Sequence, residues 1–464
     1  MSNSLLEKIT HLKNKLPTLE IITEKSDTDN YARDWTTYFK VSAGAVLFPE
    51  NTDDVISIIK WANDFRVPLV PSGGRTGLSG GACALNGEVV VSLQKMRKVL
   101  EFNAVEQTLL CQAGVVTETI QNEAHQRGLY YPVDFAARGS SHIGGNVATN
   151  AGGIRVLRYG LTRNWIASLK VVTGKGDLLH LGKGLIKDAT GPQLIHLFIG
   201  SEGILGIVTE VEVKLTTPPP PKKVLLLQSH SLTSIINCFG KLRSRHNLQA
   251  FEFFSQLGLD HVVQKFQLSP PFPEKAPFYF LTEIETPTHQ EIEKVFESLE
   301  DLFQENLIVN GTMAESTAQE RLFWSYREHI SEALSPFKPY KNDISVRIGQ
   351  IPQFIPQMDT LIKHFYPDWE VVWFGHIGDG NLHINILKPD YLSPEEFFEK
   401  CQTIDKELLK LVGKMGGAIS AEHGVGITKK PNLHLSKSSV EIETLKLLKS
   451  WFDPNNILNP GKVL

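Results

Sequence analysis

The fold is decided by the stretch Pro71-Ser72-Gly73-Gly74-Arg75-Thr76-Gly77-Leu78-Ser79-Gly80-Gly81. It follows the apolar residues 67–70, which are typical of a short buried strand. Successive backbone N–H groups with little side-chain cover form a concave anion site that suits a pyrophosphate. A surface glycine loop is an equally good interpretation of this segment when it is taken alone.

A second glycine-rich run, SSHIGGNVATNAGG, occupies residues 140–153. It joins tight glycine turns to asparagine side chains, whose amides can bind carbonyl groups and ring nitrogens. The sequence contains no G-x-G-x-x-G and no Gly-Lys pair followed by Ser or Thr, so the Rossmann and P-loop signatures are absent. Two glycine loops together favour a nucleotide-binding domain of another kind.

Strands and helices alternate around these loops. Thr52 is expected to cap a helix with Asp53 and Asp54 in its first turn. The apolar face of this helix would consist of Val55, Ile58, Ile59, Ala62 and Phe65. Further strands are predicted at residues 89–93, 109–112, 169–172 and 208–215.

The run TTPPPPKK, residues 216–223, predicts a domain boundary, because it can form neither a helix nor a central strand. The central region beyond it mixes strands, such as residues 224–228 and 278–283, with long polar helices. This pattern favours an α+β layer with helices on one face. The closing residues 429–464 are expected to fold back onto the first domain.

Length and composition exclude several classes of protein. A chain of 464 residues suggests two or three domains. With 47 basic and 51 acidic residues, it has no basic field for nucleic acid. Four scattered cysteines form no CxxC pair, which fits a reducing compartment. The sequence has no apolar run of about 18 residues, and residues 1–16 predict an amphipathic helix rather than a signal peptide. We therefore expect a cytoplasmic protein.

His376 and His383 flank a glycine-containing loop, HIGDGNLH, between two apolar strands. A four-residue hairpin loop would set His376 directly opposite His383. Cross-strand partners have Cβ atoms ~4.5–5.5 Å apart, which lets two imidazoles bind one metal. Asn385 would point to the same side of the sheet. Two ordinary sheet histidines are an equally good interpretation of this motif alone.

Glu422 and His423 lie in a glycine-flanked loop, SAEHGVG. In extended backbone, adjacent residues point to opposite sides, so one can bind a metal while the other faces a substrate. Two histidines and one carboxylate match the protein ligands of an open zinc site, and the same set serves non-haem iron. A polar pair in a surface turn is the alternative.

Longer motifs extend the pattern: PSGGRTGLSGG, YYPVDFA, GGNVATNAGGIRVLRYG, VVTGKGDLL, GSEGILGIVTE, FGHIGDGNLHINIL, SAEHGVG and DPNNILNPGK. With them the sequence resembles the FAD-linked D-2-hydroxyacid dehydrogenases of the vanillyl-alcohol oxidase superfamily over nearly its whole length. It looks most like the bacterial members that oxidise D-2-hydroxyglutarate. The resemblance implies an α+β fold: a PCMH-type FAD-binding domain (residues 1–217 and 429–464) and a central cap with an antiparallel sheet (218–428).

The resemblance also implies how FAD is held. Some relatives tether the flavin through a histidine after the paired glycines, but Arg75 stands there, so we expect noncovalent FAD. The expected FAD contacts are Pro71, Ser72, Gly73, Gly74, Arg75, Thr76, Gly77, Leu78, Pro132, Asp134, Ser140, Gly144, Gly145, Asn146, Thr149, Asn150, Gly153, Glu202, Gly206, Val208 and Asn459.

For the metal, the resemblance implies His376, His383 and Glu422 as ligands of a divalent ion, with His423 as the catalytic base. Zinc is expected, with manganese or cobalt as alternatives. Iron is disfavoured, because the flavin already carries the redox chemistry and only a Lewis acid is still needed.

The expected substrate residues are Arg327, Ser331, Lys341 and Asn385. Arg327 and Ser331 stand four residues apart in a predicted helix and would share a face. Without the resemblance, a charged pair such as Arg327 and Lys341 would be solvated surface about nine times in ten. The resemblance instead implies that they hold the distal carboxylate of the substrate.

The expected reaction converts D-2-hydroxyglutarate to 2-oxoglutarate. His423 would take the hydroxyl proton, and the α-hydrogen would leave as hydride to flavin N5. An electron-transfer flavoprotein or a quinone would accept the electrons. The alternatives are a D-lactate or broad D-2-hydroxyacid dehydrogenase, the flavin subunit of a glycolate-oxidase-like complex, a non-catalytic flavin module and a metal-dependent hydrolase. A homodimer is left open.

Overall fold

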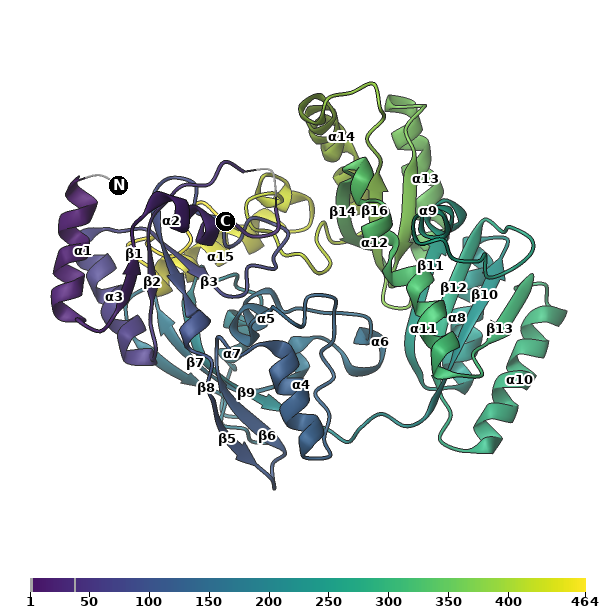
Figure 1. Cartoon of the computed structure of the whole chain (residues 1–464), viewed down its shortest axis with the longest axis horizontal. Helices are drawn as coiled ribbons and strands as arrows, with labels where there is room; N and C mark the ends of the chain where they lie inside the picture. The colour runs from purple at the N-terminus through teal and green to yellow at the C-terminus, as the bar shows by residue number, and fades with distance from the viewer. Residues whose placement is uncertain (1–2, 37–38) are drawn as a thin grey trace. The chain divides into compact units, whose positions relative to one another are not determined.

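The computed structural model describes residues 3–36 and 39–464. The chain divides into two compact units. The first comprises Met1–Gly153, Gly160–Pro218 and Glu422–Leu464, and the second comprises Ile154–Tyr159 and Pro219–Ala421. Both ends of the chain, purple and yellow in Figure 1, therefore belong to the first unit. Within the described residues, no helix is both long and apolar enough to cross a membrane.

A four-stranded sheet in the first unit delivers the first glycine loop. Its order is β1 (Glu20–Ile22), β2 (Ala43–Phe48), β4 (Glu88–Ser92) and β3 (Leu69–Ser72). Strands β2, β4 and β3 run parallel, and every residue of β4 is buried, as expected for a strand covered on both faces. The glycine loop leaves the sheet at the end of β3.

Helix α3 (Thr52–Phe65) connects β2 to β3. Its predicted apolar face is buried at Val55, Ile58, Ile59 and Ala62. The predicted cap is wrong by one residue, because the side chain of Asn51 accepts a hydrogen bond from the Asp54 N–H. Thr52 instead donates its hydroxyl to Thr209.

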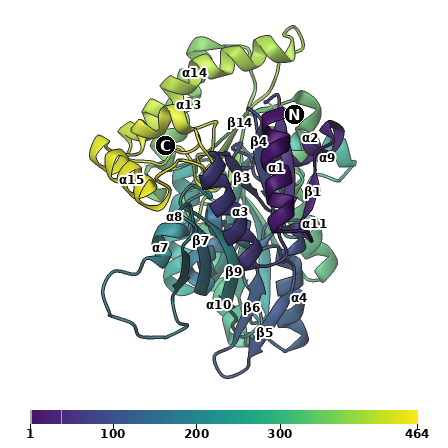
Figure 2. The same ribbon diagram turned by 90° about the vertical axis from the view of Figure 1, so that its left-hand side faces the viewer.

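A five-stranded antiparallel sheet forms the rest of the first unit's framework (Figure 2). Its order is β5 (Val99–Asn103), β6 (Thr108–Gln112), β9 (Gly206–Lys214), β7 (Ile166–Thr173) and β8 (Leu178–Leu181). Helices α3 and α5 (Ile143–Thr149) pack against it. The unit's other helices are α1 (Asn3–Lys15), α2 (Lys25–Tyr31), α4 (Thr117–Gln126), α7 (Ile195–Phe198) and α15 (Ser439–Phe452).

The closing segment is bonded directly to the parallel sheet. The Leu69 N–H donates to the carbonyl of Ile457 at 2.6 Å, and the Asn459 N–H donates to the carbonyl of Leu69 at 2.8 Å. Leu458 is fully buried beside this bridge. The last residues therefore extend the edge of the sheet at the strand that leads into the glycine loop.

The second unit is built on a seven-stranded antiparallel sheet. Its order is β13 (Asn310–Met313), β10 (Lys222–Ser229), β12 (Phe278–Glu285), β11 (Leu248–Ser255), β15 (Val371–Gly375), β16 (Asn381–Ile386) and β14 (Tyr340–Ser345). Its helices are α6 (Val156–Tyr159), α8 (Leu232–Arg245), α9 (Gln256–Phe266), α10 (His289–Gln304), α11 (Thr317–Glu328), α12 (Ile330–Ala333), α13 (Ile351–Phe365) and α14 (Pro394–Lys414).

Helices cover both faces of this sheet, so the expectation of helices on one face is wrong. All residues of β11 are buried. Phe254 packs in one core with Leu259 of α9 and Trp324 of α11. On the opposite face, Phe251 contacts Phe239 of α8. Continuous apolar runs in the central strands, rather than alternating ones, are the sequence signature of this double cover.

Candidate functional site

The two glycine-rich loops lie against each other in the first unit. A Cβ atom built on Gly74 would stand 2.0 Å from the carbonyl oxygen of Ser140. On Gly73 it would stand 3.4 Å from the Cβ of His142. Glycine at position 74 is therefore required by the approach of two backbones.

Ser72 Oγ and His142 Nδ1, which belong to these loops, are buried without a hydrogen-bond partner, as is Asp34 Oδ2 beside Gly77. Buried polar atoms are normally paired, so such atoms mark a place for a polar ligand. The guanidinium of Arg75 lies 4.6 Å from the ring centre of Tyr31. Burial lowers the pKa of His142 to about 4, helped by the charge of Arg75, so this imidazole is neutral at pH 7.

Several predicted FAD contacts use their side chains to hold the loops. Asn146 donates to Thr117 Oγ1 at 2.6 Å, and Thr149 donates to the carbonyl of Gly145 at 3.1 Å. Asn459 donates to the carbonyl of Glu202 at 2.8 Å. FAD contacts at these positions stay predictions, as do those at the remaining loop residues.

The carboxylate of Glu202 binds the loop that carries Glu422 and His423. It accepts the N–H of Val425 at 2.7 Å and that of Gly426 at 2.9 Å. Burial raises the pKa of Glu202, and the two N–H donors oppose that shift. Residues 422–428 consequently belong to the first unit, whereas the sequence grouped them with the cap. The backbone bends at residues 421–423, so the expected extended geometry around Glu422 is wrong.

The histidine hairpin has a different register from the predicted one. Phe374, not His376, lies opposite His383. The loop is longer than four residues, because the N–H groups of Asp379 and Gly380 both donate to the carbonyl of His376 in a helical turn. The imidazoles still meet, with ring centres 5.5 Å apart. A shift of two residues leaves His383 on its predicted face.

The three predicted metal ligands are divided between the two units. His376 and His383 belong to the second unit, where their imidazoles meet, and Glu422 begins the last segment of the first unit. Two imidazoles and one carboxylate suit a divalent metal of borderline softness. Their binding of one metal ion stays a prediction.

A buried carboxylate stands behind each histidine. Glu252 Oε1 lies 2.7 Å from His376 Nδ1. Asp343 Oδ1 lies 3.5 Å from His383 Nδ1 and accepts the side-chain amide of Asn381 at 2.7 Å. The hydrogen bond at Nδ1 of His376 makes Nε2 the nitrogen that this ring would offer to a metal, as in carboxylate–histidine–zinc arrangements. Sequence analysis missed both acids, although Glu252 is a lone charge in an apolar run, LQAFEFFS.

Three of the four predicted substrate residues are tied to the same face of the second unit's sheet. Lys341 pairs across strands with Asn385, and Asp343 pairs with His383, so these residues share a face. The Asn385 Oδ1 atom is buried without a hydrogen-bond partner. The Arg327 guanidinium lies 4.8 Å from the ring centre of Phe374, the neighbour of His383.

Ser331 does not share the environment of Arg327. The predicted continuous helix is broken at His329, between α11 and α12. Arg327 is 7% exposed, whereas Ser331 is exposed. Its role in substrate binding stays a prediction.

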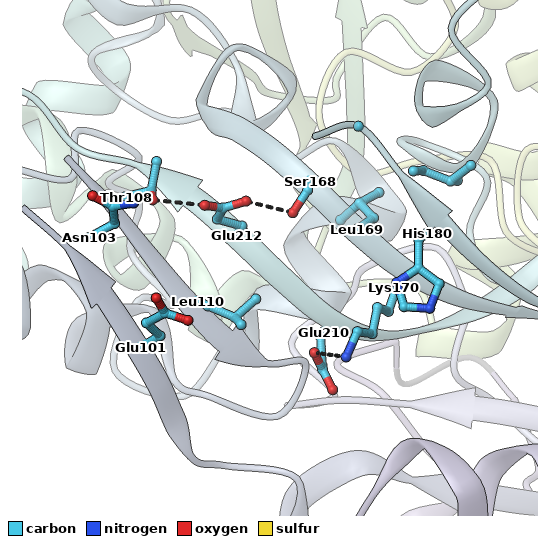
Figure 3. Close-up of a pocket in the computed structure, with 12 residues that line it drawn as sticks. Glu101, Asn103, Thr108, Leu110, Ser168, Leu169, Lys170, His180, Glu210 and Glu212 are labelled. Carbon is cyan, nitrogen blue, oxygen red and sulfur yellow. Dashed lines mark hydrogen bonds and ion pairs between the residues drawn. The ribbon is translucent and has the colours of Figure 1, made fainter. Parts of the chain in front are cut away.

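A cavity of about 240 Å³ lies elsewhere, on the five-stranded sheet of the first unit (Figure 3). Five of its polar side chains are paired within the cavity: Glu212 accepts from Thr108 and Ser168, and Lys170 lies 2.8 Å from Glu210. None of the predicted site residues lines it. The glycine loops and the histidine face therefore remain the candidate sites.

Sequence comparisons identify the relatives of this chain. The family "FAD linked oxidases, C-terminal domain" matches residues 218–463, and the "FAD binding domain" family matches residues 43–182. The chain is 48% identical to D-2-hydroxyglutarate dehydrogenase of Stutzerimonas stutzeri, covering 98% of both chains. It belongs to the FAD-linked oxidase family. The protein is thus an FAD-dependent oxidoreductase.

One further sequence relative supports this grouping, and two solved structures share the fold. The D-2-hydroxyglutarate dehydrogenase of Xanthomonas citri is 46% identical, over 98% of this chain and 96% of the relative. Among solved structures, 4-ethylphenol oxidase from Gulosibacter chungangensis matches with a TM-score of 0.77 at 17% identity, covering 100% of this chain and 97% of that one. p-Cresol methylhydroxylase matches with a TM-score of 0.74 at 16% identity, with the same coverage. These neighbours confirm the PCMH-type fold that the sequence predicted.

Proposed function

We propose that this FAD-dependent oxidoreductase converts D-2-hydroxyglutarate to 2-oxoglutarate with the help of a divalent metal. The observation that carries the proposal is the cross-strand pairing that sets Lys341 and Asn385 beside His383 and Asp343. A cation next to a metal-binding histidine suits a substrate with a second carboxylate. The D-2-hydroxyglutarate dehydrogenases that this chain resembles support the same substrate.

The glycine loops fit FAD. Their backbones approach too closely for a side chain at Gly74, and their buried Ser72 Oγ and His142 Nδ1 atoms lack partners. Noncovalent binding is proposed, because Arg75 occupies the position of the tethering histidine. Arg75 also offers a positive charge to a pyrophosphate.

The donor types of His376, His383 and Glu422, two imidazoles and a carboxylate, suit a divalent metal, with zinc preferred and manganese or cobalt as alternatives. When bound, FAD accepts a hydride and the metal acts as a Lewis acid toward the substrate oxygens.

The chain's own residues bind the substrate and move its proton. Arg327 and Lys341 supply positive charge for the distal carboxylate, and the Asn385 amide supplies a polar contact on the same face. His423 takes the proton of the α-hydroxyl group while the α-hydrogen departs with its electron pair. The oxidised product is the 2-oxo acid, and an electron-transfer flavoprotein or a quinone accepts the two electrons.

D-Lactate or a broader range of D-2-hydroxy acids is the second candidate. It is favoured by the ion pair of Arg327 with Glu252, at 2.8 Å, which already provides that arginine with a carboxylate partner. Lactate has no distal carboxylate, so its binding would not require Arg327. The metal site and base would serve either acid.

Anaerobic bleaching of the flavin tests cofactor, reaction and substrate together. The purified protein is mixed with D- and L-2-hydroxyglutarate, D- and L-lactate and glycolate, and the visible flavin absorbance is followed. Rapid bleaching by D-2-hydroxyglutarate alone is expected. Faster bleaching by D-lactate would favour the second candidate, and a yellow protein that no acid bleaches would refute the proposal.

A further inference from the structure

Glu252 is the one charged residue of strand β11, and its side chain is 1% exposed. It sits on the face that carries Ala250 and Phe254 and packs against helices α9 and α11. A carboxylate this deeply buried is stable only if its charge is compensated. Two cationic or donor groups approach it, one on each oxygen.

The first partner is the proposed metal ligand His376, whose Nδ1 lies 2.7 Å from Glu252 Oε1. A carboxylate at this position selects the tautomer with the proton on Nδ1. It thereby directs the lone pair of Nε2 away from itself, where a metal can use it. The ring is also held in one orientation.

The second partner is Arg327, whose Nη2 lies 2.8 Å from Glu252 Oε2. The contact is an ion pair that lacks the alignment of a hydrogen bond. It holds the guanidinium over the ring of Phe374. The Arg327 Nε atom remains buried without a hydrogen-bond partner, so this arginine still has a donor to offer.

We propose that Glu252 is a positioning residue that fixes the metal ligand His376 and the substrate-binding Arg327 together. This inference rests on the proposed function, since it gives His376 and Arg327 the roles assigned there. Glu252 touches neither metal nor substrate itself. One oxygen of Glu252 contacts Arg327 and the other contacts His376. Glu252 therefore sets the position of Arg327, part of the clamp (Arg327 and Lys341) proposed to bind the distal carboxylate, relative to the metal ligand.

The experiment measures zinc affinity of the purified, FAD-loaded protein by competition with a chromogenic chelator. Glu252→Gln should weaken zinc binding roughly 10- to 100-fold, the usual effect of losing a carboxylate behind a metal-binding histidine. The matched control is Glu285→Gln. Glu285 is also buried in this sheet and pairs with an arginine, Arg158, at 2.7 Å, but it contacts no proposed ligand. Glu285→Gln should keep wild-type affinity.

The outcomes separate this inference from the proposed function. A wild type that binds no zinc would refute the metal site itself. Normal zinc binding by Glu252→Gln, or an equal loss in Glu285→Gln, would refute only the role of Glu252. If Glu252→Gln does not fold, Glu252→Asp serves instead, because it keeps the charge and withdraws the carboxylate by one methylene. Glu252→Asp should then show the weakened affinity, and wild-type affinity would overturn the role.

A second readout addresses Arg327 at saturating zinc. In Glu252→Gln the KM for D-2-hydroxyglutarate should rise several-fold while that for D-lactate changes little, because only the dicarboxylate uses the clamp. A lower KM for D-2-hydroxyglutarate would mean that Glu252 competes with the substrate for Arg327, which would overturn the proposal.

Discussion

The glycine loops of the first unit and the histidine face of the second unit differ in whether their polar atoms already have partners within the protein. In the loops, residues 71–81 and 140–153, polar atoms such as Ser72 Oγ and His142 Nδ1 are buried with no partner. On the histidine face, His376 and His383 are backed by Glu252 and Asp343. One region lacks partners that a ligand would supply, and the other is already arranged by the protein.

This difference has consequences for stability. A ligand that satisfies buried polar atoms binds the folded state alone, so it stabilises the region that it completes. FAD should therefore contribute strongly to the stability of the first unit. The histidine face should keep its geometry when the metal is removed, because its carboxylates hold the rings without it.

The largest expected effect is the loss of activity on chelation. A metal-free protein should lose nearly all turnover and still retain FAD, because the proposed metal ligands do not belong to the glycine loops. Activity and flavin absorbance are measured after dialysis against a chelator, with the metal content fixed by elemental analysis. Zinc, manganese or cobalt should restore turnover. Metal-free protein that turns over at its full rate would contradict the Lewis-acid role.

His423→Asn should slow flavin reduction by ~10²–10⁴, the usual contribution of a positioned base, and should leave FAD and metal bound. His376→Asn should instead lower the metal content. Stopped-flow reduction and elemental analysis distinguish the two variants. Exposed His434 is the control, and His434→Asn should behave as wild type. Loss of metal from His423→Asn with retention in His376→Asn would reverse the assignments.

Lys341→Ala and Arg327→Ala test the choice of substrate. A charge-assisted hydrogen bond contributes ~1.5–3 kcal/mol, so each should lower kcat/KM for D-2-hydroxyglutarate roughly 10- to 150-fold. Lactate should lose little. Lys341→Ala is the cleaner variant, because Lys341 is exposed whereas Arg327→Ala also strips Glu252 of its ion pair. Equal losses on both acids would argue against D-2-hydroxyglutarate.

The two regions also differ in how far the sequence could predict them. The glycine loops depend on local backbone freedom, which glycine and asparagine reveal directly. The histidine face depends on register and on distant partners. Its hairpin was predicted two residues out of register, because Gly375, at φ 156°, and the turn after His376 lengthen the loop.

Glu252 shows why part of the site was missed. It contacts His376 across 124 positions of sequence, and no local pattern states such a pairing. Its only sequence signal is a charge within an apolar run. Helix packing on both faces of the sheet was not predicted either. Its sequence signal was the same run, residues 248–255, in which apolar residues do not alternate with polar ones. The binding of the Val425 and Gly426 N–H groups by Glu202 was also missed, and its contact with FAD stays a prediction.

Asp343→Asn tests whether the histidine face is arranged before the metal binds. Asp343 accepts from Asn381 and from the N–H of Ala421, next to the proposed ligand Glu422, and it lies beside His383. Loss of its charge should weaken zinc binding roughly 10-fold or more. The control is Asp405→Asn. Asp405 accepts from Asn342 on the same strand, and Asn342 pairs with Ile384 and therefore lies on the face opposite His383. Unchanged zinc affinity in Asp343→Asn would indicate that the metal itself orders His383.

The smallest effect is expected from two glycine substitutions in the loops. In Gly74→Ala the new methyl group meets the carbonyl of Ser140 at 2.0 Å, so the backbone must shift at a cost of ~1–3 kcal/mol. That corresponds to a Tm lower by several degrees in the FAD-free protein.

Gly145→Ala places its methyl group with no atom within 4 Å and should leave this Tm unchanged. If Gly145 contacts FAD as predicted, Gly145→Ala should still weaken FAD binding, whereas Gly74→Ala should weaken both FAD binding and the fold. Scanning calorimetry of the FAD-free proteins and flavin titration separate these effects. An equal loss of Tm in both variants would show that Gly145 is packed as tightly as Gly74. It would contradict the proposal that the space beside Gly145 binds FAD.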